Sequence, residues 1–310
     1  MKTHVIPTGL AAVFTLGLVS SAFADLPTPI LEYTFNDTDA TSASTGSNTT
    51  AVAFRDSSYA SANLHGTAGS GLTGLAGDIA FDNTASAGMG SASGASGGGG
   101  GVIGDIDSGS TGSDWLTSFT VQGWYYSSVQ MGGAARILDK TSGSTSSFLL
   151  RGATTNGQMN LTVDNLSVDS GTGYTATGQW VFFAASYDGS LTSNNVKFYV
   201  GDTTTSVSLV STGTVNSGLV SNNVVSMVLG NSSHNPSLAD ANNRPFDGLL
   251  DDIRLYGSAS DSTGVLSLAT LEAIRTSDIS AVPEPSTYAL LFGSVSLGIA
   301  TFSTRRRKQK

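Results

Sequence analysis

FDGLLDDIRLYG, residues 246–257, is the stretch of sequence that decides the fold. Side chains of a β-strand point alternately to its two faces, so residues two apart in sequence lie on the same face. The alternation predicts a strand with two different faces: Asp251, Ile253 and Leu255 on one, and Asp252, Arg254 and Tyr256 on the other. The adjacent Asp251 and Asp252 are therefore expected to point in opposite directions.

Four further segments have the pattern of strands. Residues 118–128, SFTVQGWYYSS, place large apolar side chains on both faces, which is typical of a strand covered on both sides. Residues 179–190, QWVFFAASYDGS, end in a turn signal and predict a hairpin with residues 194–202. Residues 224–231 add another strand, and residues 266–275, LSLATLEAIR, form the expected helix. Many short strands separated by turns predict an all-β antiparallel sandwich.

The composition also favours strands over helices. The 310 residues include 38 Gly and no Cys, and Ser and Thr are abundant, which favours strands joined by tight turns. A chain without disulfides must be stabilised by its core or by metal ions, and its length is sufficient for a core. Residues 84–113 contain a run of five Gly and few residues that could be buried, so they predict a flexible Gly/Ser-rich loop within the domain.

The N-terminal residues 1–24 have the pattern of a secretory signal peptide. Lys2 supplies a positive charge, an apolar stretch follows, and Ala22-Phe23-Ala24 forms a small-residue cleavage site. Cleavage is expected between Ala24 and Asp25, so that an exported domain begins at residue 25 and extends to residue 281.

The C-terminus has the pattern of a membrane anchor. Residues 288–304 are apolar or small, and as a helix they would span roughly 25 Å, enough for a thin bilayer. Five basic residues follow, and basic residues stay on the cytoplasmic side of a membrane. The segment therefore predicts a single transmembrane helix in the inner membrane, with the domain outside.

Three features in order at this end resemble the PEP-CTERM sorting signal of Gram-negative bacteria. They are the triplet Pro283-Glu284-Pro285, the apolar segment, and the cluster Arg305, Arg306 and Arg307, and the resemblance covers residues 282–310. It implies that an exosortase-type membrane protease cuts the tail near the triplet, which makes the anchor temporary. It also implies a host that makes exopolysaccharide.

The charge of the expected mature domain limits its partners. Residues 25–281 contain eight Lys and Arg and 22 Asp and Glu, a net charge of −14. Such a surface repels nucleic acid and anionic lipid, so neither is an expected partner. Carboxylates also suit Ca²⁺, which prefers oxygen ligands.

The order of the segments resembles a known domain. ILEYTFND, SFTVQGWYY, ARILDK, FLLRGATTNGQMNLTV, QWVFFAASYDGS, VKFYVGD and FDGLLDDIRLY follow one another over nearly all of residues 30–276. This series resembles the LamG-like domain of the concanavalin A-like lectin/glucanase group, which implies a jelly-roll sandwich. The resemblance implies that Asp251 coordinates a structural Ca²⁺ together with the region of Asn36 and Asp37. A turn or edge carboxylate bonded to backbone amides is the alternative role for Asp251.

The sequence gives no catalytic residues. Glycoside hydrolysis normally needs two carboxyl groups beside the scissile bond, and the sequence has only Glu32, Glu272 and Glu284, none in an acidic i, i+2, i+4 series. Only two His follow the signal peptide, and no Ser has the context of a nucleophile. Catalysis by an Asp pair from distant loops stays an alternative.

Non-catalytic recognition is the expected function. Trp115, beside Asp114, could form an aromatic platform for a sugar ring, or could be a rim residue that covers the core. We expect a cell-surface or extracellular-matrix protein with a carbohydrate-binding or structural role in exopolysaccharide or biofilm. A glycoside hydrolase or lyase on the same fold is the alternative.

Overall fold

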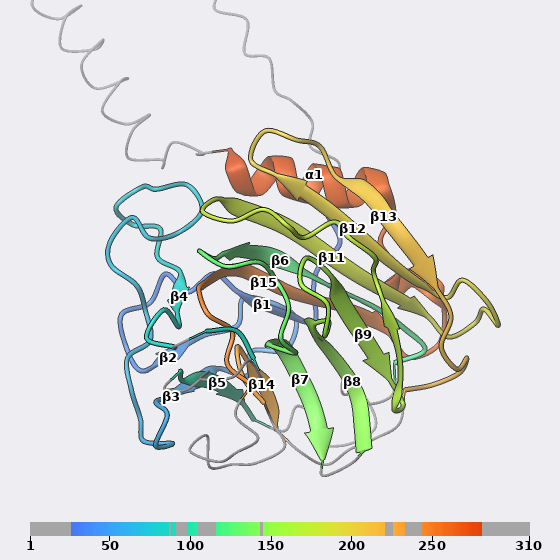
Figure 1. Cartoon of the computed structure of the whole chain (residues 1–310), viewed down its shortest axis with the longest axis horizontal. Coiled ribbons are helices and arrows are strands. Elements are labelled where there is room, and N and C mark those ends of the chain that lie inside the picture. The colour runs from blue at the N-terminus through green and yellow to red at the C-terminus, as the bar shows by residue number, and fades with distance from the viewer. Residues whose placement is uncertain are drawn as a thin grey trace, which may run out of the picture.

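A computed structural model describes residues 26–86, 88–90, 98–104, 116–142, 145–220, 226–232 and 244–280. These residues form two antiparallel β-sheets packed face to face, with one α-helix on the outside (Figure 1). The expected all-β antiparallel sandwich is confirmed, and its architecture is consistent with a jelly roll.

Sheet A has seven strands in the order β1-β15-β6-β11-β12-β13, with β4 paired to β15. Its strands are β1 (Leu31–Tyr33), β4 (Phe81–Asp82), β6 (Ser118–Tyr126), β11 (Trp180–Asp188), β12 (Val196–Asp202), β13 (Ser208–Gly213) and β15 (Leu249–Ser258). The two centrally placed strands β6 and β11 pair over their whole lengths, from Trp180 opposite Tyr126 to Asp188 opposite Ser118.

Sheet B has eight strands in the order β10-β9-β8-β7-β14-β5-β3-β2. They are β2 (Thr41–Ser42), β3 (Val52–Arg55), β5 (Gly100–Ile103), β7 (Arg136–Ser142), β8 (Thr145–Gly152), β9 (Met159–Val163), β10 (Leu166–Asp169) and β14 (Met227–Leu229). Consecutive strands β7 to β10 pair in chain order, whereas β14 inserts between β7 and β5.

The main core lies between the sheets and contains the inward side chains of both. Phe119 on β6 packs against Phe148 on β8, with 5.0 Å between ring centroids, and against Tyr187 on β11 at 5.5 Å. All three side chains are almost completely buried. Burying an aromatic side chain stabilises a fold by about 1.5–3 kcal/mol, so the contact of Phe119 with Phe148, which joins the two sheets, contributes to holding the layers together.

A second, smaller core lies on the outer face of sheet A, beneath helix α1 (Leu268–Ile279) and the 3-10 helix η2 (Ser262–Gly264). Trp124, Phe182 and Tyr199 of the sheet pack there with Leu271 and Ile274 of α1. α1 begins after Ser267, whose side chain accepts a hydrogen bond from Thr270 N, a typical N-cap. The expected helix is confirmed, and it extends four residues beyond the predicted end at residue 275.

The strands agree with the predicted segments except within residues 84–113. The structure places β5 there, between β3 and β14, where a flexible loop was expected. The glycines make this strand possible, because a Cβ at Gly100 or Gly101 would overlap Asn231 or Val52. Side chains larger than that of Gly do not fit at Gly100 and Gly101, because residues of the neighbouring strands occupy the space beside them.

The predicted faces of β15 were wrong at one position. The register between β15 and β6 shifts between Asp251 and Arg254, and Asp252 has a left-handed φ of 49°. This bulge puts Asp251 opposite Trp124, on the outer face of sheet A, whereas Ile253 lies in the main core. Asp251 therefore shares a face with Arg254 and not with Ile253, because a bulge adds one residue and breaks the alternation.

The expected terminal segments lie outside the described residues. They are the signal peptide at residues 1–24 with its cleavage point at Ala24 and Asp25, the membrane helix at residues 288–304, and the sorting signal. Within the part of the chain that the structure describes, no helix has the length and apolar character needed to cross a bilayer.

Candidate functional site

Of the sequence-predicted site residues, the structure describes Asp251 and Asp37. Trp115 lies outside the described residues. Of the other two Trp, Trp124 is fully buried, whereas Trp180 is partly exposed at the start of β11. Trp180 packs edge-on against Tyr126, with 5.9 Å between ring centroids.

Asp251 is a buried carboxylate whose oxygens accept backbone hydrogen bonds. Leu72 N donates to Oδ2 and Asp252 N donates to Oδ1, each at 2.8 Å. Burial, with a smaller effect from the charges of Asp252 and Asp78, raises the pKa of Asp251 well above its usual value. These contacts match the alternative role of a carboxylate bonded to backbone amides.

Asp37 lies in the loop after β1 and organises that loop. Its Oδ2 accepts hydrogen bonds from Ser42 Oγ and Ala43 N, both at 3.0 Å, and the neighbouring Asn36 Oδ1 accepts from Ile79 N at 2.8 Å. Among the described residues, no three His, Asp or Glu side chains are grouped closely enough to hold a metal ion. The Ca²⁺ site at Asp251 and Asp37 stays a prediction.

An ion-pair cluster surrounds Arg254 on the outer face of sheet A. Its guanidinium lies 2.5 Å from Glu32, 3.2 Å from Asp252 and 3.0 Å from Asp278 of α1. Trp124 Nε1 also donates to Asp278 at 2.9 Å. Burial raises the pKa of Asp252 to about 7, although the charge of Arg254 opposes the shift.

A raised carboxyl pKa is also what a glycosidase acid needs, but this cluster has a structural role. Only 4% of the Asp278 side chain and 11% of the Arg254 side chain are exposed, so a sugar cannot reach them. The cluster instead fastens α1 to β1, β6 and β15. Helix α1 therefore covers the outer face of sheet A in the region of this cluster.

The outer face of sheet B carries the second group of polar side chains. Arg136 of β7 lies opposite Arg151 of β8, which lies opposite Asn160 of β9, which lies opposite Asp169 of β10. Cross-strand partners share a face, so these four side chains form one row, the arginine row, across four strands. α1, the α-helix of the described residues, does not contact this sheet face.

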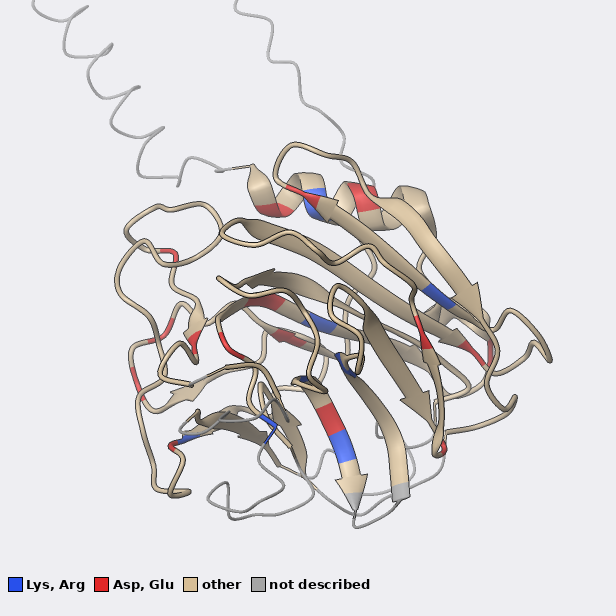
Figure 2. Cartoon of the chain, in the orientation of Figure 1, with Lys and Arg blue, Asp and Glu red and all other residues tan. Residues whose placement is uncertain are grey.

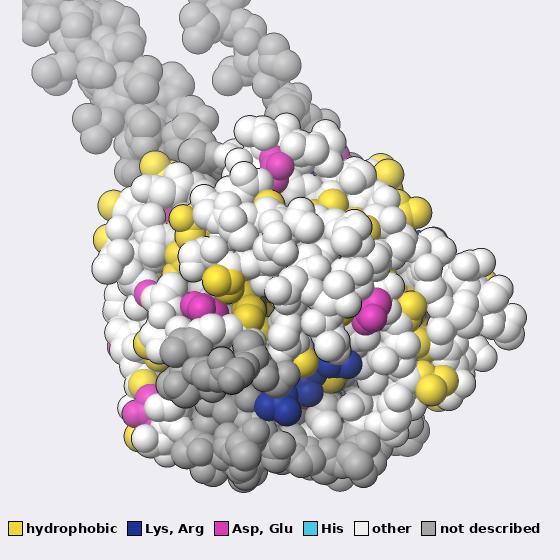
Figure 3. All heavy atoms as spheres, in the orientation of Figure 1, with side chains coloured by type: hydrophobic (Ala, Val, Ile, Leu, Met, Phe, Trp, Pro, Cys, Tyr) yellow, Lys and Arg dark blue, Asp and Glu magenta, His cyan; other side chains and the backbone are white. Residues whose placement is uncertain are grey.

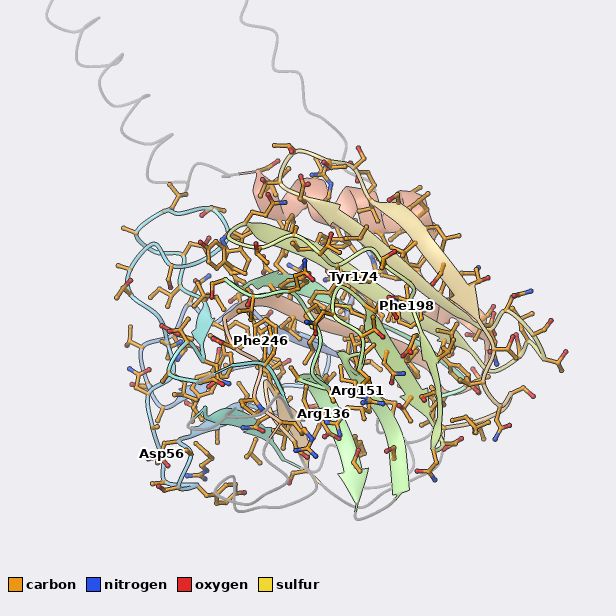
Figure 4. All side chains as sticks on the ribbon, viewed as in Figure 1. Asp56, Arg136, Arg151, Tyr174, Phe198 and Phe246 are labelled. Atoms are coloured by element: carbon orange, nitrogen blue, oxygen red, sulfur yellow. The ribbon has the colours of Figure 1, made fainter. Side chains whose placement is uncertain are left out.

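Hydrogen bonds join three of the four residues of the arginine row. Arg151 Nε donates to Asn160 Oδ1 at 3.1 Å, and Asn160 Nδ2 donates to Asp169 Oδ1 at 2.6 Å. Asn160 is buried, whereas Arg136 and Arg151 are partly exposed and Asp169 is exposed. The row is therefore an ordered and partly exposed polar surface, and Figure 4 labels its two arginines, Arg136 and Arg151.

The electrostatics of the row differ from those of the rest of the molecule. Burial lowers the pKa of Arg136 to about 10, opposed by the charge of Asp139 and reinforced by those of Arg151 and Arg244. Arg136 Nε lies 3.2 Å from Asp139 Oδ2. Blue side chains gather at the lower middle of the surface in Figure 3, while acidic ones are scattered.

Sequence reasoning missed the arginine row. Arg136, Arg151 and Arg244 stand far apart in sequence, and only the strand register puts the first two side by side. The available signal was the scarcity of basic residues, since few positions of the mature domain are Lys or Arg.

The comparisons agree with this fold. Residues 98–265 match the family model of the concanavalin A-like lectin/glucanases superfamily, which is more than half of the chain. The chain therefore belongs to that superfamily, as the sequence resemblance predicted. No curated protein matches the sequence.

Several solved structures are similar at low identity. Domain 4 of AbnA, a GH43 extracellular arabinanase from Geobacillus stearothermophilus in complex with arabinotriose, has 16% identity and a TM-score of 0.47, and the match covers 81% of this chain and all of that one. A putative carbohydrate binding protein from Bacteroides ovatus has 13% identity and a TM-score of 0.41, covering 56% and 43%. The PL-14 alginate lyase from Aplysia kurodai has 9% identity and a TM-score of 0.37, covering 75% and 100%. At this similarity none of them indicates what this chain binds.

Proposed function

We propose that this protein is a non-catalytic carbohydrate-recognition protein of the cell surface or extracellular matrix, and that the outer face of sheet B binds the ligand. The arginine row is the observation that carries the proposal. Sugar sites present a few ordered polar groups on a rigid surface, and hydrogen bonds hold Arg151 and Asn160 in place on neighbouring strands. Membership of a lectin and glucanase superfamily supports a saccharide ligand.

The alternative function is that of a glycoside hydrolase or lyase. The carboxyl groups with raised pKa values argue against hydrolysis, because each of them forms hydrogen bonds or ion pairs within the protein. Asp252 and Asp278 lie in the Arg254 cluster, and Asp251 is buried and bonded to the backbone amides of Leu72 and Asp252. Asp247, whose pKa burial also raises, accepts a hydrogen bond from Gly88 N at 3.1 Å.

The test separates binding from cleavage. The purified protein is passed over immobilised host exopolysaccharide and is also incubated with the same polymer in solution. Retention without new reducing ends or unsaturated products supports recognition. New chain ends would support the enzyme, and absence of both retention and products would contradict each function.

Export and sorting are part of the proposal. The signal peptide and the PEP-CTERM resemblance support passage across the inner membrane, temporary anchoring and cleavage by an exosortase-type protease. Mass spectrometry of the mature C-terminus tests this: a terminus near Val282 in the medium supports cleavage, whereas an intact Lys310 in the membrane fraction contradicts it.

We also retain calcium as a proposed structural ligand at Asp251 and Asp37. The expected result is a melting temperature that EDTA lowers and Ca²⁺ restores in the native protein. In Asp251→Ala this response to Ca²⁺ should be lost. An equal melting temperature of the native protein with EDTA and with Ca²⁺ would rule the site out.

A further inference from the structure

Positive charge is concentrated on the sheet B side of an acidic molecule. Residues 25–281 contain only eight Lys and Arg, against 22 acidic residues. Figure 2 shows the blue positions on the strands. Sheet B carries Arg55, Arg136, Lys140 and Arg151, and Arg244 adjoins it because Arg136 N donates to Arg244 O at 3.0 Å. Five of the eight basic residues therefore belong to or adjoin sheet B, and four of them contribute to its surface, since the Lys140 side chain is completely buried.

The other three basic residues are not on sheet B: Arg254 and Arg275 form ion pairs, and Lys197 lies on sheet A. Arg254 is surrounded by carboxylates, and Arg275 pairs with Glu272 at 2.7 Å on α1. Lys197 belongs to β12 of sheet A, opposite Thr212. Among the described residues, only the sheet B side thus brings Arg side chains together.

The arginine pair is placed at a cost to stability. Arg136 and Arg151 are directly opposite on β7 and β8, and like charges opposite each other destabilise a sheet. Arg244 adds a third positive charge that acts on both, while the charge of Asp139 acts on both arginines with the opposite sign and that of Asp169 acts so on Arg151. Arrangements that oppose local stability are characteristic of functional sites. Asp139 offsets part of the repulsion within the protein, and a bound anion would offset more of it.

The guanidinium of Arg136 also has unused donors. Neither Nε nor Nη1 has a hydrogen-bond partner among the described residues, although both atoms are buried, and the contact with Asp139 is an ion pair without hydrogen-bond geometry. Buried donors without partners are costly. The side chain keeps 15% of its surface exposed, and since Nε and Nη1 are buried, a ligand approaches the exposed part of the side chain and not these two atoms.

We propose that Arg136 and Arg151 bind the anionic groups of an acidic polysaccharide, an assignment that rests on the proposed function and names the class of sugar. A guanidinium presents a planar fork of donors that matches a carboxylate or a sulfate with two parallel hydrogen bonds. Asp169, exposed at the end of the row, presents a carboxylate to sugar hydroxyls, and the buried Asn160 holds Arg151 and Asp169 in position. Carboxylated and sulfated polymers share this chemistry and are separated in the test.

The net charge of −14 does not prevent such binding. At physiological ionic strength the Debye length is about 8 Å, so exposed acidic residues farther away are largely screened. The contact between a guanidinium and an anion is much shorter than this length. Affinity should therefore fall as salt is raised beyond the physiological level, because the local attraction is then screened as well.

The test measures binding of the full chain to three polymers by affinity electrophoresis: polygalacturonate, dextran sulfate and uncharged dextran. We expect retardation by polygalacturonate, by dextran sulfate, or by both, and the stronger of the two identifies the anionic group. Arg136→Gln and Arg151→Gln should each weaken that binding about tenfold, the loss typical of one charged hydrogen-bonding partner. Arg151→Lys should be intermediate, because it keeps the charge but loses the planar fork.

Lys197→Gln is the matched control, since it removes one positive charge from sheet A, and it should bind like the native protein. Circular dichroism and melting temperature identify variants that remain folded. Native affinity in both folded Arg→Gln variants, or no retardation by either acidic polymer, would overturn the inference. If dextran or host exopolysaccharide still bound, the proposed function would survive; if no polysaccharide bound, both would fall.

Discussion

Gln122 on β6 is a buried polar side chain without a visible function. It lies on the face of sheet A that α1 covers, opposite Arg254, and is completely buried. Neither its Oε1 nor its Nε2 has a hydrogen-bond partner among the described residues. An amide in this situation loses its hydrogen bonds with water on folding and regains none.

Replacing Gln122 with Met should therefore stabilise the protein. The two side chains have similar length and shape, so the change should disturb the packing little. The stability gained by removing an unsatisfied amide should exceed the stability lost through packing. We expect the free energy of unfolding to rise by about 1 kcal/mol, measured by urea denaturation. Gln122→Ala is the control, and it should destabilise the protein because it leaves a cavity. A less stable Gln122→Met variant would contradict this account.

At the scale of elements, β5 shows how a glycine-rich segment can be a strand. Gly101 lies against Val52 and Phe54 of β3, and a Cβ at this position would overlap the Val52 side chain. Gly101→Ala should destabilise the fold by about 1–3 kcal/mol through overpacking. Gly77→Ala is the matched control, because Gly77 is exposed and has no atom within 4 Å of the added Cβ. Urea denaturation measures both, and equal stabilities would contradict the packing argument.

Helix α1 supplies a second prediction at this scale. Asp278 joins α1 to the sheet through Arg254 and Trp124 Nε1. Asp278→Ala leaves the indole N–H without its acceptor and removes one of three carboxylates around Arg254. We expect the free energy of unfolding to fall by about 2–3 kcal/mol. This is at or below the lower end of the range for breaking a buried ion pair, because Glu32 and Asp252 still pair with Arg254. Leu268→Ala, an exposed position on the same helix, should change stability little. Thermal unfolding of both variants checks the difference.

The strands that could be predicted from sequence are those with apolar side chains on both faces. Residues 118–126 and 180–188 belong to this class because sheet A has a core on each side. The bulge at Asp252 could not be predicted, since its left-handed φ depends on the register with β6. Nor could the pairing of Arg136 with Arg151, because alternation gives the faces of a strand but not its partner.

For the whole molecule, the position of the carboxyl groups determines how stability changes with pH. Hydrogen bonds from Arg275, opposed by burial, lower the pKa of Glu272 to about 2, and hydrogen bonds from Ser258 and Thr263 lower that of Asp261 to about 2. Below the usual carboxyl pKa, the unfolded chain holds more protons than the folded chain at these groups. Stability should therefore rise with pH from about 2 to about 4.5.

Asp252 has the opposite effect at higher pH. Burial raises its pKa to about 7, opposed by Arg254 and reinforced by Asp278, Asp78 and Glu32. Between its unfolded pKa of 3.8 and about 7, the folded chain holds more protons than the unfolded chain, so stability should fall as pH rises. Because stability rises with pH up to about 4.5 and falls at higher pH, the free energy of unfolding should be largest at about pH 4–5. Urea denaturation from pH 3 to pH 8 tests this. Asp252→Asn should reduce the fall in stability above pH 5, while Asp251, Asp278 and Asp247, whose pKa values burial also raises, keep part of it, and the rise below pH 4.5 should be unchanged. A native protein more stable at pH 7 than at pH 5 would show that Arg254 keeps Asp252 ionised throughout.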